Sequence, residues 1–156
     1  MVPSDELIWS ADWAWSLPLI VVTVVFHVLG LGLFNEEFVS RMAGAVAGRH
    51  STAMFGVVMS ATVLVATILH GVEAAIWAAA YRFLGALPDV KSAMLYSLSS
   101  MTTYGHANVY LRQHWQLMGA LEALNGIILF GLTTAFLFSA IQSVWPLGAR
   151  AWDAQR

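Results

Sequence analysis

The sequence predicts an all-α membrane protein with three transmembrane helices, and with a re-entrant helix and loop between the second and the third. Two observations support this fold class. Hydrophobic residues make up 59% of the 156 residues and charged residues only 10%, a balance outside that of soluble domains. The hydrophobic residues also gather in three runs that approach or exceed the ~20 residues a helix needs to cross a bilayer.

The three apolar runs predict spanning helices at residues 17–34, 53–80 and 115–145. The first carries no formal charge, and the only ionisable residues of the second are His70 and Glu73. The third has tryptophan at both margins, where the aromatic belt of a membrane protein lies, and it is followed by a proline. All three runs therefore predict helices in lipid.

A shorter segment between the second and third helices begins at Pro88 and Asp89, which supply a turn and an N-cap. Residues 90–100 then predict a helix too short to span the membrane. A helix that enters the membrane and stops needs protein or water for its last carbonyls and the following backbone, because lipid forms no hydrogen bonds. Residues 97–108 are therefore predicted to line a pore or cavity.

The loops predict how the chain is oriented in the membrane. Arginines in the linker and in the C-terminal tail fall on one side of a three-span chain, and the positive-inside rule makes that side cytoplasmic. The N-terminus is then outside, and its acidic first residues lack the positive region of a cleaved signal. We divide the chain into an N-terminal part with the first helix and linker, a pore domain and a short tail: 1–52, 53–145 and 146–156.

Composition and motifs exclude several functional classes. Seven Lys and Arg with a net charge of −2 give no basic face for nucleic acid. The absence of cysteine excludes disulfides, thiolate metal sites and cysteine nucleophiles. Catalytic triads, phosphate loops and metalloprotease motifs are also absent. We therefore expect no enzymatic activity and no resident cofactor.

The segment SLSSMTTYGHAN at 97–108, with the helices around it, resembles the pore domain of small bacterial members of the potassium-channel superfamily. The likeness runs over residues 93–139 in the order pore helix, filter, outer loop and inner helix. It implies a homotetramer in the lipid bilayer of the bacterial inner membrane. Backbone carbonyls would replace the hydration shell of a monovalent cation, with potassium expected first. The implied filter residues are Thr102, Thr103, Tyr104, Gly105 and His106.

This filter departs from the Thr-Val-Gly-Tyr-Gly-Asp pattern of the family. Thr103 and Gly105 are kept, whereas Tyr104 replaces a small residue and Ala107 replaces the outer glycine. A positive φ at that alanine would cost about 1–2 kcal/mol per chain. His106 replaces a tyrosine, and two roles for it are open. Its four copies are charged by external acid and weaken the passage of cations, or a neutral His106 hydrogen-bonds behind the filter as the tyrosine would. A non-selective or differently selective cation pore is therefore an alternative.

Further polar residues lie near the predicted level of the filter. His70 and Glu73 share a face of the second helix, as Glu122 and Asn125 do on the third, and His27 of the first helix lies at a similar depth. The residues expected to support the filter are Ala107, Asn108, Ser99, Ser100, His70, Glu73, Glu122 and Asn125.

These polar residues have several possible roles. One is a hydrogen-bonded network with Ser99 or Ser100 that braces the filter, and another is proton transfer. A metal held by His70, Glu73 and His27 would suit a non-conducting membrane scaffold instead. A haem between His27 and His70 would suit a redox subunit.

Two glycines of the third helix, Gly126 and Gly131, have two interpretations. The resemblance makes each a candidate bend for an intracellular gate. Small residues in lipid also allow helices to pack closely.

Overall fold

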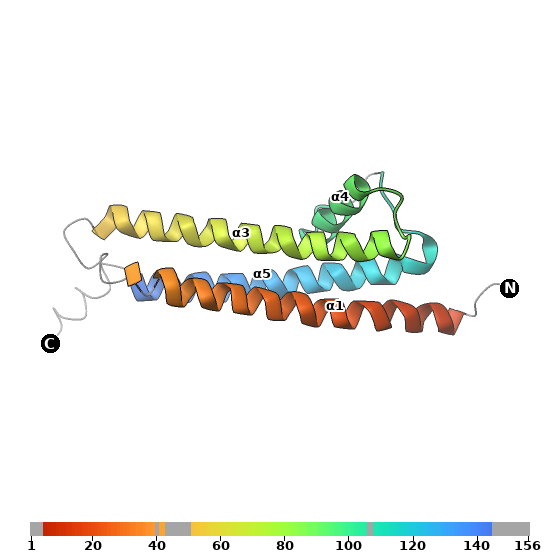
Figure 1. The fold of residues 1–156 in the computed structure, drawn as a ribbon, viewed down its shortest axis with the longest axis horizontal. Helices are drawn as coiled ribbons and strands as arrows, with labels where there is room; N and C mark the ends of the chain where they lie inside the picture. Colours follow the sequence, from red (N-terminus) through yellow and green to blue (C-terminus); the bar gives the residue numbers. More distant parts are fainter. Residues whose placement is uncertain (1–4, 40, 43–50, 106–107, 145–156) are drawn as a thin grey trace. The chain divides into compact units, whose positions relative to one another are not determined.

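The computed structural model describes residues 5–39, 41–42, 51–105 and 108–144, and within these ranges it contains helices, turns and loops but no strand. The predicted all-α fold is confirmed, with three long helices and a short one between the second and third (Figure 1). The elements in chain order are α1 (Asp5–Phe34), the π-helical turn η1 (Asn35–Val39), α3 (Ser51–Phe83), α4 (Val90–Met101), the 3₁₀ turn η2 (Gln113–Trp115) and α5 (Gln116–Val144).

Three helical stretches are long and apolar enough to cross a membrane, namely Trp9–Val39, Thr52–Phe83 and Gln113–Ser143. The first helix begins at Asp5 rather than at residue 17. The apolar run begins only at residue 17 because acidic residues precede it. Acidic residues are nevertheless favoured at a helix N-terminus, so the helix extends beyond the apolar run. The tail at 146–156 and half of the predicted linker at 35–52, namely residues 40 and 43–50, lie outside the described residues.

The chain divides into two compact units. The first comprises Met1–His27 and His70–Phe130, and the second comprises Val28–Leu69 and Gly131–Arg156. In the second unit, Leu31, Ala66 and Leu69 form a buried cluster against Phe136. The candidate site lies in the first unit.

The first unit buries polar side chains and exposes apolar ones. Among its described residues, the buried polar ones are Asp12, Ser16, Thr23, His27, Glu73, Ser97, Ser99, Ser100, Glu122 and Asn125. Its exposed apolar residues include Val21, Val22, Val25, Val72, Leu124 and Ile127. This distribution is expected of helices surrounded by lipid, where polar groups turn toward the protein interior.

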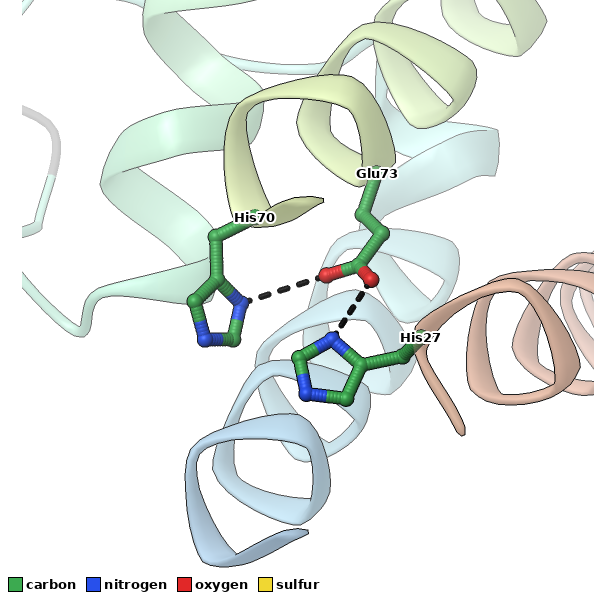
Figure 2. A group of neighbouring side chains, drawn as sticks. All are labelled: His27, His70 and Glu73. Carbon is green, nitrogen blue, oxygen red and sulfur yellow. Dashed lines mark hydrogen bonds and ion pairs between the residues drawn. The ribbon is translucent and has the colours of Figure 1, made fainter. Parts of the chain in front are cut away.

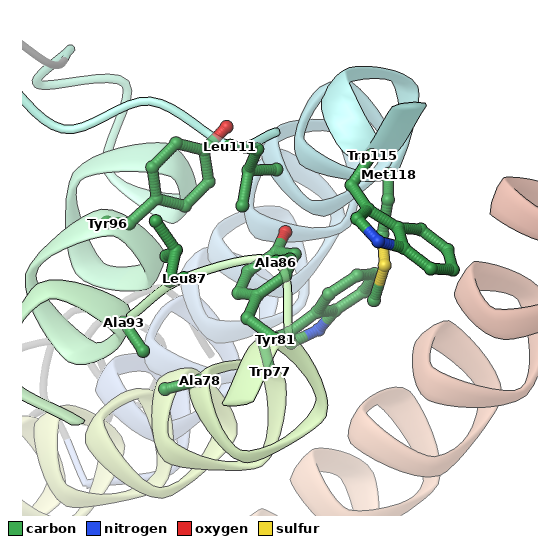
Figure 3. Packing of buried hydrophobic residues seen from close by; sticks show 10 residues of the cluster. All are labelled: Trp77, Ala78, Tyr81, Ala86, Leu87, Ala93, Tyr96, Leu111, Trp115 and Met118. Carbon is green, nitrogen blue, oxygen red and sulfur yellow. The ribbon is translucent and has the colours of Figure 1, made fainter. Parts of the chain in front are cut away.

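An aromatic cluster joins the end of α3 to α4 and to the start of α5 (Figure 3). Trp77 and Tyr81 of α3 are fully buried beside Trp115 and Met118. The ring of Tyr81 meets that of Tyr96 edge-on, with centroids 5.4 Å apart, an arrangement that aromatic pairs favour. The cluster therefore positions α4 where it enters the bundle.

The turn after α3 depends on Gly85, which has a φ of +64°. The Gly85 N–H donates to the Arg82 carbonyl at 3.1 Å, and the Ala86 N–H donates to the Tyr81 carbonyl at 2.9 Å. This pair of hydrogen bonds around a left-handed glycine is a common way to end a helix. It turns the chain toward the start of α4.

Helix α4 begins at the predicted cap, Asp89. The Asp89 carboxylate accepts hydrogen bonds from the backbone N–H of Ser92 at 2.9 Å and from the Ser92 hydroxyl at 2.7 Å. Both hydrogen bonds favour the charged carboxylate and hold the pKa of Asp89 below its usual range, and the bond from the Ser92 backbone has the larger effect. The cap satisfies an N–H that the first turn of the helix leaves unpaired.

We expect this cap to make thermal stability depend on pH. The pKa of an unfolded aspartate is ~3.9 and that of folded Asp89 is lower. The stabilisation is therefore fully present above about pH 4 and is lost as the pH falls through the folded pKa. Asp89→Asn keeps an acceptor but does not titrate. In detergent, the unfolding temperature of the wild type should fall more steeply below pH ~4 than that of the variant, and parallel curves would contradict the prediction.

Candidate functional site

Helix α4 ends deep between α3 and α5. Its last residue, Met101, packs against Ala74 and Leu129, and its backbone lies against Gly126. Gly126 is ten positions beyond Gln116, the first residue of α5, which corresponds to about 15 Å along the helix axis. The loop after Met101 therefore begins beside the first half of α5, well inside the stretch Gln113–Ser143 that is long and apolar enough to cross a membrane.

Two glycines allow this close approach of α4 to α5. A Cβ at Gly126 would lie 2.7 Å from the Cα of Met101, and a Cβ at Gly119 would overlap the hydroxyl of Tyr96. Gly119 and Gly126 are seven residues apart and therefore lie on one face of α5. Ser100 adds a hydrogen bond from its hydroxyl to the Gly119 carbonyl at 2.9 Å. The two glycines thus form the surface on which α4 rests.

The two gate candidates have different surroundings. Gly126 meets the backbone of Met101, whereas a Cβ at Gly131 would have nothing within 4 Å. Helix α5 continues through both positions. At Gly126 the geometry favours close packing over a hinge.

The C-terminal end of α4 places a threonine in a left-handed conformation. The Tyr104 N–H donates to the Ser99 carbonyl at 3.0 Å and the Thr103 N–H to the Ser100 carbonyl at 3.1 Å, the same pattern as at the end of α3. Here the left-handed residue is Thr103, with a φ of +56°. A β-branched residue in this region is strained, and such strain clusters at functional sites.

The predicted filter residues that the structure describes are exposed in the single chain. They are Thr102, Thr103, Tyr104 and Gly105, and Tyr104 is 86% exposed. Gly105 has a φ of +85°, which suits glycine because it has no Cβ. Asn108 is also exposed. His106 and Ala107 lie outside the described residues.

Glu122 of α5 is fully buried behind α4 and joins three helices. Its Oε2 accepts a hydrogen bond from the Tyr81 hydroxyl of α3 at 2.7 Å. Its Oε1 lies within hydrogen-bond distance of the Ser97 hydroxyl of α4, whose single proton has the Ala74 carbonyl, at 2.8 Å, as its second acceptor. This one carboxyl group therefore links α4 to both neighbours.

His27, His70 and Glu73 form a separate buried group (Figure 2). The Nδ1 of His27 lies 2.7 Å from Oε1 of Glu73, and the Nδ1 of His70 lies 3.2 Å from Oε2. The His70 ring stacks on Phe130, with centroids 4.4 Å apart. Both rings therefore turn a nitrogen toward the carboxylate.

The polar residues predicted at one level thus divide into three sets. His27, His70 and Glu73 meet, whereas Glu122 binds other partners. The Nδ2 of Asn125 donates to the Thr23 hydroxyl of α1 at 2.8 Å. Of the two serines expected in a network, Ser100 reaches the Gly119 carbonyl and Ser99 is buried.

Sequence reasoning did not predict three of these hydrogen-bond partners: Tyr81 and Thr23 had no site role, and Ser97 appeared only as part of the pore-lining stretch 97–108. Helical spacing offered a signal for two of them. Thr23 lies four residues before His27, and Tyr81 lies eight after Glu73, so each shares a face with a residue that was chosen. Ser97 gave no such signal, because the SLSS run offers three serines and only the packing of α4 selects one.

Comparison with known proteins relates part of the chain to ion channels. Residues 69–143 match the family model described as Ion channel. The match covers slightly less than half of the chain and includes the end of α3, α4 with its loop, and nearly all of α5; α1 lies outside it. No curated protein and no solved structure matches the chain. The family match and the three apolar helices together support an ion channel in a membrane.

Proposed function

We propose that the protein is one subunit of an oligomeric cation channel that conducts passively through the loop after α4. The observation that carries the proposal is the course of α4. This helix lies within the stretch that matches the ion-channel family, ends against Gly126 inside the apolar length of α5, and leaves Thr102 to Gly105 exposed. By the resemblance above, four copies surround one pathway, and potassium is the first ion expected.

The exposed loop supports assembly. Irregular backbone at membrane depth needs protein or water around it, because lipid leaves its N–H and C=O groups unpaired at a cost of several kcal/mol each. Further copies of the chain around an axis would supply protein on one side of the loop and a water-filled path on the other. The proposed arrangement therefore gives the loop both surroundings that it requires.

The backbone of the loop supports conduction through carbonyl groups. Thr103 and Gly105 have positive φ, and Tyr104 between them does not. In the proposed assembly, the carbonyls of these exposed residues would face the common pathway. A row of carbonyls around an axis is the arrangement that replaces the hydration shell of potassium in selective channels.

The test is ion flux through purified protein in liposomes, with a potassium gradient, a sodium gradient or none. We expect potassium flux in the wild type and its loss in Gly105→Asp, which puts a side chain at a φ of +85° and a charge in the pathway. Gly85→Asp is the matched control, because Gly85 also has a positive φ and open space around it but lies in the turn after α3. That variant should still conduct.

Each outcome of the flux assay has a distinct meaning. Equal fluxes of potassium and sodium would favour the non-selective alternative. A fall in flux between about pH 8 and 5.5 would support charging of His106. If the wild type passes no cation over that range, or if both glycine variants conduct equally, the proposed pathway is wrong.

A further inference from the structure

The group of His27, His70 and Glu73 has the geometry of a metal site. One donor atom from each residue lies within 4.8 Å of the others, and both imidazoles turn Nδ1 toward the carboxylate (Figure 2). Bonds of about 2.0–2.2 Å to a tetrahedral ion place ligand atoms roughly 3.3 Å apart. The Nδ1 to oxygen distances, 2.7 Å to Oε1 and 3.2 Å to Oε2 of Glu73, therefore need to widen by about 0.6 and 0.1 Å for an ion to enter.

The donors themselves select the class of ion. Two imidazoles and one carboxylate suit zinc and other divalent transition metals, whereas magnesium and calcium prefer oxygen ligands alone. Three protein ligands leave a further coordination position for water or another small ligand. A haem does not suit the same residues, because ring centroids of His27 and His70 only 5.0 Å apart leave no space for a porphyrin between them.

Burial gives a reason for a cation at this position. Glu73 and His27 are fully buried, and the His70 side chain is 14% exposed. A carboxylate taken out of water is costly unless a positive charge or good hydrogen bonds compensate it. The two imidazoles supply hydrogen-bonding nitrogens to this carboxylate. A divalent ion would compensate the carboxylate and use the imidazole nitrogens as ligands.

The surroundings orient the ligands in advance. His70 and Glu73 are three residues apart on α3 and therefore project from one face. Stacking on Phe130 holds the His70 ring. His27 comes from α1, which is absent from the stretch that matches the ion-channel family. A shared ion would thus join this additional helix to the helices of the matched stretch.

We propose that His27, His70 and Glu73 bind one divalent transition-metal ion, zinc first, which ties α1 to α3. The site is separate from the proposed conduction pathway, and its test uses no flux measurement. Loss of channel activity would therefore leave this proposal intact, and loss of metal binding would leave the channel proposal intact.

The test is cobalt(II) titration of the full chain in detergent after treatment with a chelator, followed by displacement with zinc. Cobalt at a nitrogen and oxygen site of low coordination number gives visible absorption bands that aqueous cobalt lacks. We expect the bands to saturate at one cobalt per chain and to disappear when one equivalent of zinc is added. Zinc should also raise the unfolding temperature, because it binds the folded chain in preference to the unfolded one.

Variants identify the ligands. Glu73→Gln keeps the size of the side chain but removes a ligand oxygen and its charge, and it should weaken cobalt binding by more than about 100-fold, since even changes outside the first ligand shell cost 10–100-fold. His114→Gln is the matched control, because His114 is exposed and outside the group, and it should bind as the wild type does. If Glu73→Gln does not fold, His70→Gln at the edge of the group replaces it.

Two results would overturn the proposal. One is a wild-type chain that shows no cobalt bands at stoichiometric cobalt and no change in unfolding temperature with zinc. The other is equal cobalt affinity in the wild type and in the ligand variant. Either result would leave the three residues as a hydrogen-bonded brace between α1 and α3.

Discussion

Replacing Gly126 with alanine should lower the thermal stability of the protein and reduce its ion flux strongly. The added Cβ would lie 2.7 Å from the Cα of Met101, and both groups belong to backbones that shift only together with their helices. Overpacking of this kind destabilises a chain by about 1–3 kcal/mol, and in the proposed assembly each of the four copies would be destabilised in this way. The end of α4 and the loop that follows would move away from α5, and the proposed pathway would be disturbed. The unfolding temperature in detergent measures the loss of stability, and potassium flux in liposomes measures the loss of conduction.

Gly131→Ala is the matched control for this variant. It lies on the same helix, where an added Cβ meets nothing within 4 Å. Both substitutions gain up to about 1 kcal/mol of helix propensity, so the difference between them isolates the clash with Met101. We expect Gly131→Ala to be at least as stable as the wild type and to conduct. Equal stability and flux in the two variants would show that α4 does not rest on Gly126, and a loss confined to Gly131→Ala would favour a hinge there.

The fold was predictable because a helix that crosses lipid needs a run of about 20 apolar residues, which can be read from the sequence. Long apolar runs predict the three spanning helices, and Asp89 predicts the start of α4. The predicted start of α1 was wrong. Asp5, Glu6 and Asp12 precede the apolar run and were left out of the predicted helix, but the helix includes them. Hydropathy reports where a chain is apolar, whereas a helix continues as long as its backbone hydrogen bonds do.

The polar groups were predictable only within one helix. The spacing of His70 and Glu73 places them on a common face, but the contact of Glu73 with His27 joins residues 46 positions apart. The role of Gly126 likewise requires the position of Met101. Such contacts depend on the distance and rotation between helices, and one sequence carries no direct record of either.

The partners of Glu122 lead to the second large expected effect. Glu122→Ala should destabilise the protein by about 2–4 kcal/mol, because it leaves a cavity and removes the acceptor of the buried Tyr81 hydroxyl. Glu122→Gln should lie within about 1 kcal/mol of the wild type. The glutamine oxygen can accept from Tyr81, and its amide can donate to Ser97, whose own proton still reaches the Ala74 carbonyl.

A double-mutant cycle separates this hydrogen bonding from the cavity. Tyr81→Phe should cost about 1–2 kcal/mol in the wild type but much less in Glu122→Ala, because the acceptor of the hydroxyl is already gone. Unfolding temperature and denaturant titration in detergent give the four stabilities. If the cost of Tyr81→Phe is the same in both backgrounds, the Tyr81 to Glu122 bond contributes nothing. The link between α3, α4 and α5 would then rest on the aromatic cluster, the glycine surface and the hydrogen bonds of Ser97 and Ser100 to backbone carbonyls.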